Sequence, residues 1–335
     1  MTDANTNPEP TPAVSTGRHD ARDAALRVEE AGDLIERITE NIQRVIVGQH
    51  DATEHILTTI LARGHLLLED VPGVGKTMLA RAVARSVDCS FKRVQFTPDL
   101  LPSDVTGVNV FNQKTREFEF QPGPVFAHVL LGDEINRAPP KTQAALLEAM
   151  EEEQVTVDGE SRPLPDPFTV IATQNAVEPN RTYELPVAEI DRFMKKLELG
   201  YPSPEDESEL LERVVGIHPI DALEPVATIE DVRRARITVA TVTVEKPIRA
   251  YVTRLANYTR EHATLGVSPR GSISLLRAAQ ARAVLDDRDY VIPDDVKTEA
   301  LPVLAHRVRT ETSDRVGGEA GRSLVQAALD DVPVE

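Results

Sequence analysis

One stretch of this chain, from Gly64 to Ala80, combines an apolar run, closely spaced glycines and the start of a helix. It reads GHLLLEDVPGVGKTMLA. The apolar residues between His65 and Glu69 predict a buried strand, because a short apolar run bounded by turn signals is typical of a strand covered on both faces. The glycines that follow, and the segment from Lys76, predict a tight loop that leads directly into a helix. A strand, a loop and a helix in this order restrict the folds that the chain can adopt.

The loop has the composition of a phosphate-binding loop of a nucleoside-triphosphatase. It closes with Gly73, Gly75, Lys76 and Thr77. Backbone N–H groups of such a loop, with the N-terminus of the helix behind them, surround anionic phosphates. Lys76 is expected to reach the β- and γ-phosphates, and the Thr77 hydroxyl is expected to ligate Mg²⁺. The loop departs from the general motif at one position, since Asp70 stands where that motif has its first glycine.

A second apolar strand, starting at Val129, ends in Gly132, Asp133 and Glu134. In phosphate-loop NTPases such a strand lies beside the one that feeds the loop. Asp133 is then expected to hold Mg²⁺, directly or through water, and Glu134 to orient and deprotonate the attacking water. Two acids at a strand end could also simply be solvated, but their order after the loop favours nucleotide hydrolysis. Gly132 in the strand interior predicts that another backbone approaches closely there.

A third apolar strand, predicted at 168–173, leads into Gln174 and Asn175. If this strand lies between the two motif strands, Asn175 points at the γ-phosphate and can position the attacking water. Asn at a strand end is commonly just a turn residue. The order of Asn175 after the acid pair favours the functional interpretation.

Two arginines could interact with a phosphate. Arg192, in Glu189–Phe193, could neutralise charge on the nucleotide of a neighbouring subunit, where such an arginine is worth about 10³ to 10⁵ in rate. Its spacing fits a surface ion pair equally well. Arg270 lies in the first turn of a helix that Ser268 introduces. A cation there opposes the helix dipole, so it needs an anion nearby, either a phosphate or a carboxylate.

Strands and helices alternate over the first part of the chain, which predicts an α/β fold with a mostly parallel sheet and helices on both faces. Two β-hairpins interrupt the alternation, at about 105–121 and about 154–162. From Tyr201 onwards the pattern is mainly helical. The predicted organisation is a disordered tail at 1–22, a nucleotide-binding core at 23–200 and a helical domain at 201–335.

Composition bears on where the protein works. The chain has 55 acidic and 37 basic residues, a net charge of −18, and little lysine. This balance favours adaptation to concentrated salt over an ordinary acidic cytosolic protein, which weakens acidity as an argument against nucleic-acid binding. The single cysteine, Cys89, excludes an intrachain disulfide and is expected to be a small buried residue. Without a long apolar run or a signal-peptide pattern, a soluble cytoplasmic protein is expected.

In this order, the five elements resemble those of AAA+ ATPases and, more narrowly, those of the MoxR family. The resemblance extends over roughly residues 25–310. It is carried by LLLEDVPGVGKT (66–77), QFTPDLLPSDVTG (95–107), PGPVF (122–126), DEINRAPPKTQAALLEAMEE (133–152), ATQN (172–175), LPVAEIDRF (185–193), GYPSPEDE (200–207) and SPR (268–270). Loops of this family resemble the present one in lacking the first glycine, which accounts for Asp70.

The resemblance implies an αβα AAA+ core with a helical lid, a ring of subunits that is often hexameric, and ATP with Mg²⁺ at the subunit interfaces. The implied nucleotide-binding residues are Val47, Gly48 and Gln49 near the adenine, and Pro72, Gly73, Val74, Gly75, Lys76, Thr77 and Met78 around the phosphates. The implied metal-binding residues are Thr77 and Asp133.

The resemblance also implies a role for each of the remaining candidates. Glu134 corresponds to the catalytic acid, Asn175 to the first sensor and Arg192 to the arginine finger. Arg270 corresponds to the second sensor and, because the lid is displaced in this group, could act on a neighbour's nucleotide. Arg137 is a second candidate for interface charge.

By resemblance, the function is that of a chaperone-like remodeller, which helps to assemble protein complexes or to load metal cofactors and often has partners with von Willebrand factor A domains. The sequence does not identify the protein on which it acts.

The alternative is a nucleic-acid motor or loader. The first hairpin opposes it, since Lys114 and Arg116 are balanced by Glu117 and Glu119 and no basic stripe results. A scaffold that binds ATP and barely hydrolyses it is disfavoured by the intact acid pair.

Overall fold

The computed structural model describes residues 24–70, 73–175, 183, 185–214, 219–310 and 318–334. The predicted tail at 1–22 and Pro72, one of the predicted phosphate-binding residues, lie outside the described residues. For Asp70 and Asn175 the backbone is described and the side chain is not.

The centre of the molecule is a parallel sheet of five strands in the order β2-β5-β8-β1-β9. The strands are β1 (Leu66–Asp70), β2 (Phe91–Gln95), β5 (Val129–Asp133), β8 (Thr169–Asn175) and β9 (Lys195–Leu197). Strand β8 separates β5 from β1, so the expectation that the acid-bearing strand lies directly beside the loop strand is wrong. The strand of Asn175, β8, instead lies between the two motif strands, which is the arrangement that its predicted role requires. All five strands end at the same edge of the sheet.

Helices cover both faces of this sheet. Side chains alternate along β1, so Leu66 and Leu68 join one apolar core while Leu67 joins the other. The first core is completed by helices α2 (Val28–Gln43), α3 (His50–Leu61) and α4 (Lys76–Ser86). The second is completed by α5 (Pro102–Thr106) and α6 (Pro140–Glu152).

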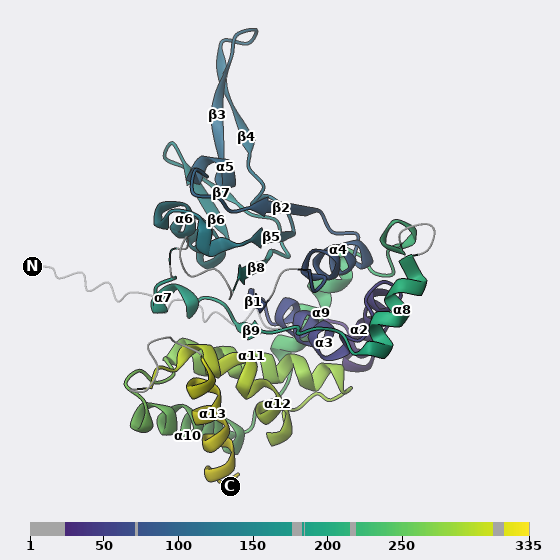
Figure 1. Cartoon of the computed structure of the whole chain (residues 1–335), viewed down its shortest axis with the longest axis vertical. Helices are drawn as coiled ribbons and strands as arrows, with labels where there is room; N and C mark the ends of the chain where they lie inside the picture. The colour runs from purple at the N-terminus through teal and green to yellow at the C-terminus, as the bar shows by residue number, and fades with distance from the viewer. Residues whose placement is uncertain are drawn as a thin grey trace, which may run out of the picture.

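Two hairpins lie on the side of the second core. The first, β3 (Gly107–Asn112) with β4 (Glu117–Pro122), projects from the body of the protein (Figure 1). The second pairs β6 (Gln154–Val157) with β7 (Glu160–Pro163). The hairpins contact each other, because the Arg162 guanidinium lies 4.1 Å from the Phe120 ring centroid and Asn109 Nδ2 donates to Asp158 Oδ2 at 2.7 Å. Both predicted hairpins are therefore present.

The remainder of the described chain is helical, as predicted. It comprises α8 (Pro204–Val214), the 3₁₀ turn η3 (Pro219–Ala222), α9 (Ile229–Thr241), α10 (Lys246–His262), α11 (Pro269–Leu285), α12 (Pro293–Leu304), η4 (Ala305–Arg307) and α13 (Glu319–Asp331). Most of these helices gather below the sheet in Figure 1. Helices α9 and α11 pack against α2 and α3, and the first apolar core continues into them without a break.

A buried charge network also joins this helical region to the sheet. The Lys195 ammonium on β9 lies 2.6 Å from the Glu299 carboxylate on α12, and both side chains are fully buried. The Arg282 guanidinium on α11 pairs with the same carboxylate. Burial alone would raise the pKa of Glu299, but the nearby charges of Lys195 and Arg282 and a hydrogen bond from His55 lower it to about 2. Glu299 therefore stays ionised and holds α11 and α12 against β9.

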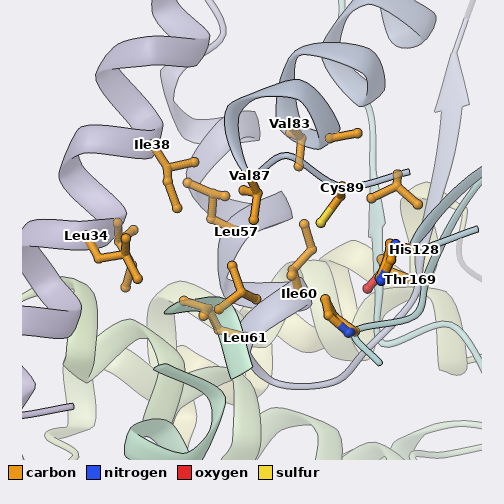
Figure 2. Close-up of a pocket in the computed structure, with 15 residues that line it drawn as sticks. Leu34, Ile38, Leu57, Ile60, Leu61, Val83, Val87, Cys89, His128 and Thr169 are labelled. Carbon is orange, nitrogen blue, oxygen red and sulfur yellow. The ribbon is translucent and has the colours of Figure 1, made fainter. Parts of the chain in front are cut away.

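A small pocket of about 30 Å³ remains beside the first core, between α2, α3 and α4 (Figure 2). A single water needs roughly 10–15 Å³ of such space, so the pocket could hold only one or two. Cys89 lies on its wall, partly buried, and burial raises the pKa of its thiol to about 11. A thiol with this pKa stays protonated and unreactive at neutral pH. Cys89 therefore contributes to packing.

Gly132 lies against a side chain, so the expectation of a second backbone near it is wrong. A Cβ atom at Gly132 would lie 3.1 Å from the Phe96 ring and 3.7 Å from Leu146 Cδ2. The Phe96 side chain is fully buried on this face of β5. The missing side chain of Gly132 leaves the space that the aromatic ring fills.

His65 lies fully enclosed at the start of β1. Its Nε2 donates to the Met150 carbonyl at 3.0 Å, and its Nδ1 accepts from the Val170 N–H at 3.0 Å. A carbonyl can only accept and an amide N–H can only donate, so these partners select the neutral ring protonated at Nε2. Burial lowers the pKa of His65 to about 4.

We expect the free energy of unfolding to fall by up to about 3 kcal/mol through His65 alone as the pH is lowered from about 6.5 to about 4. In the unfolded chain His65 binds a proton below about 6.5, whereas in the folded chain it stays neutral until about 4. Urea unfolding at stepped pH values measures the effect. His65→Gln should flatten this pH dependence, and His262→Gln, at an exposed position, should not. An unchanged pH slope in His65→Gln would contradict the assignment.

Candidate nucleotide-binding site

The predicted phosphate loop has the backbone that its sequence requires. Gly73 and Gly75 have φ of +93° and +90°, and no atom lies near the position of a Cβ on either residue. Both glycines are therefore required by backbone conformation, since other residues rarely adopt such angles. Helix α4 begins at Lys76, directly after Gly75, so its free N–H groups and the positive end of its dipole face the loop. This is an anion-binding geometry.

A cleft of about 400 Å³ brings the loop together with the acid pair. It is lined by Gly73, Gly75, Lys76, Thr77, Met78, Arg93, Gln95, Asp133, Glu134, Thr173 and Gln174. The loop contributes the first five of these residues, and the carboxyl ends of β2, β5 and β8 contribute the others. Two segments far apart in the sequence thus meet at one edge of the sheet.

A second cavity of about 220 Å³ adjoins the first. It is lined by Val45, Ile46, Val47, Gln49, Gly73, Val74, Gly75, Met78, Pro202, Leu210 and Arg213. Gly73, Gly75 and Met78 line both cavities, so the two lie on either side of the loop. This mainly apolar cavity has the position and composition suited to a nucleoside base.

Gly48, the remaining residue predicted near the adenine, closes a turn beside this cavity. Its φ is +72°, and a Cβ on it would lie 2.2 Å from Asp206 Oδ2 on α8. Gln49 Nε2 lies 3.5 Å from the Val74 carbonyl of the loop. Helix α8 thus closes the cavity with Leu210 and Arg213, which the sequence did not single out.

Asp133 is held at the floor of the cleft by two neighbouring strands. Its Oδ2 accepts from Arg93 Nη2 on β2 at 2.6 Å, and its Oδ1 accepts from the Thr173 hydroxyl on β8 at 2.7 Å. The Thr173 hydroxyl also accepts from the Glu134 N–H at 2.9 Å. Thr173 therefore joins the two acids, and neither Thr173 nor Arg93 was identified from the sequence.

Glu134 stands on a left-handed turn, with φ of +55°, that directs it away from the strand. Its Oε2 accepts from Gln95 Nε2 at 2.9 Å and from Arg137 Nη1 at 2.6 Å. Arg137, considered above for the subunit interface, thus pairs with Glu134 of its own chain. The sequence linked Asn175 to this site only because its strand follows the acid pair along the chain. In the structure, the backbone of Asn175 at the end of β8 pairs with that of Asp70 at the end of β1.

The residues present fit a bound magnesium ion. Thr77 and Asp133 line the same cleft, and Mg²⁺ is commonly held by one or two protein oxygens together with phosphate oxygens and waters. Within the described part of the chain, no cluster of three or more His, Cys, Asp or Glu side chains offers a metal site made by the protein alone. A metal bound here would therefore share its ligands with a nucleotide.

Arg192 and Arg270 lie elsewhere, and neither lines the two cavities. Both pair with Glu151 at the end of α6: Arg192 Nε lies 3.2 Å from Oε2 and Arg270 Nη2 lies 2.5 Å from Oε1. The anion required near Arg270 is therefore a carboxylate in this structure. The two arginines, one from the segment after α7 (Val187–Ile190) and one from α11, are brought together at one point.

Fold and site together are those of an ATPase core of the AAA class with its lid. Residues 65–195 match the family model of the ATPase family associated with various cellular activities (AAA), and residues 255–327 match that of the AAA lid domain. Over 95% of its length the chain superposes on a solved structure from Cytophaga hutchinsonii ATCC 33406, with a TM-score of 0.86, 36% identity and 99% of that chain covered.

Sequence relatives narrow this class. The chain is 50% identical to the uncharacterized protein YeaC of Bacillus subtilis strain 168, over 91% of this chain and 96% of YeaC. It is 42% identical to Chaperone MoxR1 of Mycobacterium tuberculosis, covering 87% and 79% of the two chains. It is 33% identical to Protein MoxR of Methylorubrum extorquens, covering 94% and 96%. The chain belongs to the MoxR family of AAA+ ATPases.

Membrane insertion has no candidate segment in the described residues, since no helix there combines the length and the apolar character that spanning a bilayer requires.

Proposed function

We propose that this protein binds ATP with Mg²⁺ and hydrolyses it to ADP and phosphate. The observation that carries the proposal is the single cleft that contains both the phosphate loop and the acid pair. In this proposal the base lies in the cavity lined by Val47 and Gln49, and the phosphates lie over the loop from Gly73 to Met78. Lys76 neutralises the β- and γ-phosphates. The metal, held by Thr77 and Asp133, supplies charge neutralisation at the phosphate oxygens.

Glu134 acts on the attacking water in this proposal. Its carboxylate is aimed by Gln95 and Arg137, which both donate to Oε2, and its other oxygen, Oε1, can accept from a water. Asn175, at the end of the strand between the two motif strands, shares in positioning that water. A general base contributes about 10² to 10⁴ in rate, which is the contribution expected of Glu134.

The two arginines at Glu151 complete the site from a neighbouring subunit. They lie outside the cleft of their own chain, so we assign them to the γ-phosphate of the next subunit in a ring, with a hexamer as the proposed assembly. Arg192 is then the arginine finger and Arg270 the second sensor, acting in trans. An arginine supplied in trans stabilises the charge of the transition state.

Phosphate release from ATP by the purified protein tests the hydrolysis. Release is expected with Mg²⁺ and should stop when EDTA removes the metal, because in the proposed site only Thr77 and Asp133 of the protein hold it. Readdition of Mg²⁺ should restore the rate. The test is made in high and in moderate salt, since the net charge of −18 indicates a protein adapted to concentrated salt. Release that persists in EDTA would contradict the proposed metal site.

The work done with ATP is proposed to be chaperone-like remodelling of protein complexes in the cytoplasm, including assembly or metal-cofactor maturation. Support comes from the relative named Chaperone MoxR1. A protein with a von Willebrand factor A domain is the proposed kind of partner. A nucleic-acid motor is the weaker candidate, because the projecting hairpin carries Lys114 and Arg116 beside Glu117 and Glu119.

Affinity capture with the ATP-bound Glu134→Gln form in high salt distinguishes these roles. A specific protein that is recovered with ATP and released with ADP supports the remodeller. Recovery of DNA alone supports the motor. The matched control is the same variant without nucleotide, from which neither should be recovered.

A further inference from the structure

Arg307, in η4, is a buried arginine whose guanidinium uses every donor it has. Its Nε donates to Asp191 Oδ1 at 2.7 Å, and its Nη2 donates to the carbonyls of Asp191 at 3.1 Å and Phe193 at 2.8 Å. Its Nη1 donates to the carbonyls of Met194 at 3.1 Å and Val303. An arginine has five N–H donors. The side chain, 3% exposed, is therefore fully committed to this one arrangement.

The acceptors of Arg307 lie on both sides of Arg192. The carbonyls of Asp191 and Phe193 are held by one guanidinium, so the backbone directly before and after Arg192 is fixed. Helix α7 ends at Ile190 and β9 begins at Lys195, so the segment between them is held by turn hydrogen bonds of its N–H groups and by Arg307. The N–H groups of Arg192 and Phe193 donate to Glu189 and Ile190, and Arg307 binds the carbonyls that these turns leave over.

Arg307 also supports the helix start that carries Arg270. Ser268 caps α11 by accepting from the Gly271 N–H at 3.2 Å, and its hydroxyl donates to Asp191 Oδ2 at 3.0 Å. A Cβ on Gly271 would lie 2.7 Å from Arg307 Cδ, so the helix backbone rests on the stem of this arginine. Asp191 thus binds Arg307 through one oxygen and the cap of α11 through the other.

We propose that Arg307 is a positioning residue, which holds Arg192 and Arg270 in one fixed geometry so that they act together on the nucleotide of the neighbouring subunit. This inference rests on the proposed function. The two arginines already converge on a single carboxylate, that of Glu151, as they would on a single phosphate. Long cationic side chains lose much rotamer freedom when they bind an anion. Backbone that is already fixed at the two arginines adds no further entropic cost to that binding. Arg307 contacts neither cavity, so it acts only through the residues it holds.

Arg307→Lys tests the proposal, because lysine keeps the charge but has three donors in place of five. The rate of hydrolysis by the assembled ring is expected to fall about 10- to 100-fold, as for other small misplacements of a catalytic group, while the affinity of the monomer for ATP is unchanged. The matched control is Arg236→Lys. Arg236 is equally buried at 3% exposed and binds the Ile60 carbonyl and Asp166, away from both arginines. This control should lose stability and keep its rate per folded subunit.

Mixing subunits separates positioning from a merely structural role. Arg307→Lys subunits keep an intact cleft, and Glu134→Gln subunits keep intact arginines but cannot hydrolyse. Mixed rings place the intact arginines of one beside the intact cleft of the other. The mixture is therefore expected to hydrolyse several-fold faster than the sum of the two proteins measured separately. If Arg307→Lys does not fold, Ser268→Ala, which removes the hydroxyl that caps α11 and donates to Asp191, should show a smaller loss that the same mixing reverses.

The outcomes distinguish a failure of the positioning role of Arg307 from a failure of the proposed function. No gain on mixing Arg307→Lys or Ser268→Ala with Glu134→Gln, while Arg192→Ala does gain, overturns the positioning role and leaves the proposed function standing. A rate for Arg307→Lys equal to that of the wild type overturns it as well. If the wild-type protein releases no phosphate from ATP, the proposed function itself fails.

Discussion

Replacing Glu134 by Gln is expected to slow ATP hydrolysis by at least about 100-fold while leaving ATP binding intact. The amide has nearly the shape of the carboxylate and keeps an oxygen that can accept from Gln95 or Arg137, so the cleft should stay formed. It cannot accept the proton of the attacking water. Phosphate release in a single turnover measures the chemical step, and titration with a fluorescent ATP analogue measures binding.

Glu36→Gln provides the matched control for this variant. Glu36 is an exposed carboxylate on α2, away from both cavities, and the substitution makes the same chemical change. Its turnover should equal that of the wild type. Near-normal turnover of Glu134→Gln would refute the assignment of Glu134 as the base and leave the binding site unaffected.

Arg192→Ala is expected to reduce hydrolysis by about 10³ to 10⁵, the range for an arginine supplied in trans. Nucleotide binding by the monomer should not change, because Arg192 lines neither cavity of its own chain. The measurement is the hydrolysis rate as a function of protein concentration, followed together with the oligomeric state. In the wild type the rate per subunit should rise as rings assemble, and in Arg192→Ala it should stay low throughout.

Arg277→Ala is the control for Arg192→Ala. Arg277 is an exposed arginine on α11, the same helix that carries Arg270, and its removal should leave the rate unchanged. A wild-type form that cannot assemble yet hydrolyses ATP at the full rate would contradict the trans arrangement. It would also return Arg192 to the simpler role of a surface ion pair with Glu151.

Local sequence signals predicted many of the elements well. Helices α6 and α10 each have a proline in the first turn, where proline is favoured. The hairpin predicted at about 154–162 turns at Asp158 and Gly159, and both residues adopt the positive φ that such a two-residue turn requires. These features depend on residues a few positions apart, so one sequence contains the information.

The order of the strands in the sheet was harder to predict from the sequence. Apolar runs identify β1, β5 and β8 individually, but their neighbours depend on how the crossover helices pack on the sheet. Gly132 was misread for the same reason: the ring of Phe96 that occupies its space belongs to a segment 36 residues earlier in the chain. The partners Arg93, Gln95 and Thr173 were missed because no local pattern distinguishes them from ordinary strand residues.

The chain alone predicted the chemistry of the phosphate loop and of the acid pair, because short contiguous motifs encode them. Tertiary structure decided which residues aim those acids and where the two arginines lie. Asp133 and Glu134 are aimed from β2, β8 and η1 (Ile135–Arg137). Arg192 and Arg270, 78 residues apart, meet at Glu151 because Arg307 and Asp191 hold their segments together. Such contacts depend on how separate elements pack, and packing is a property of the whole folded chain.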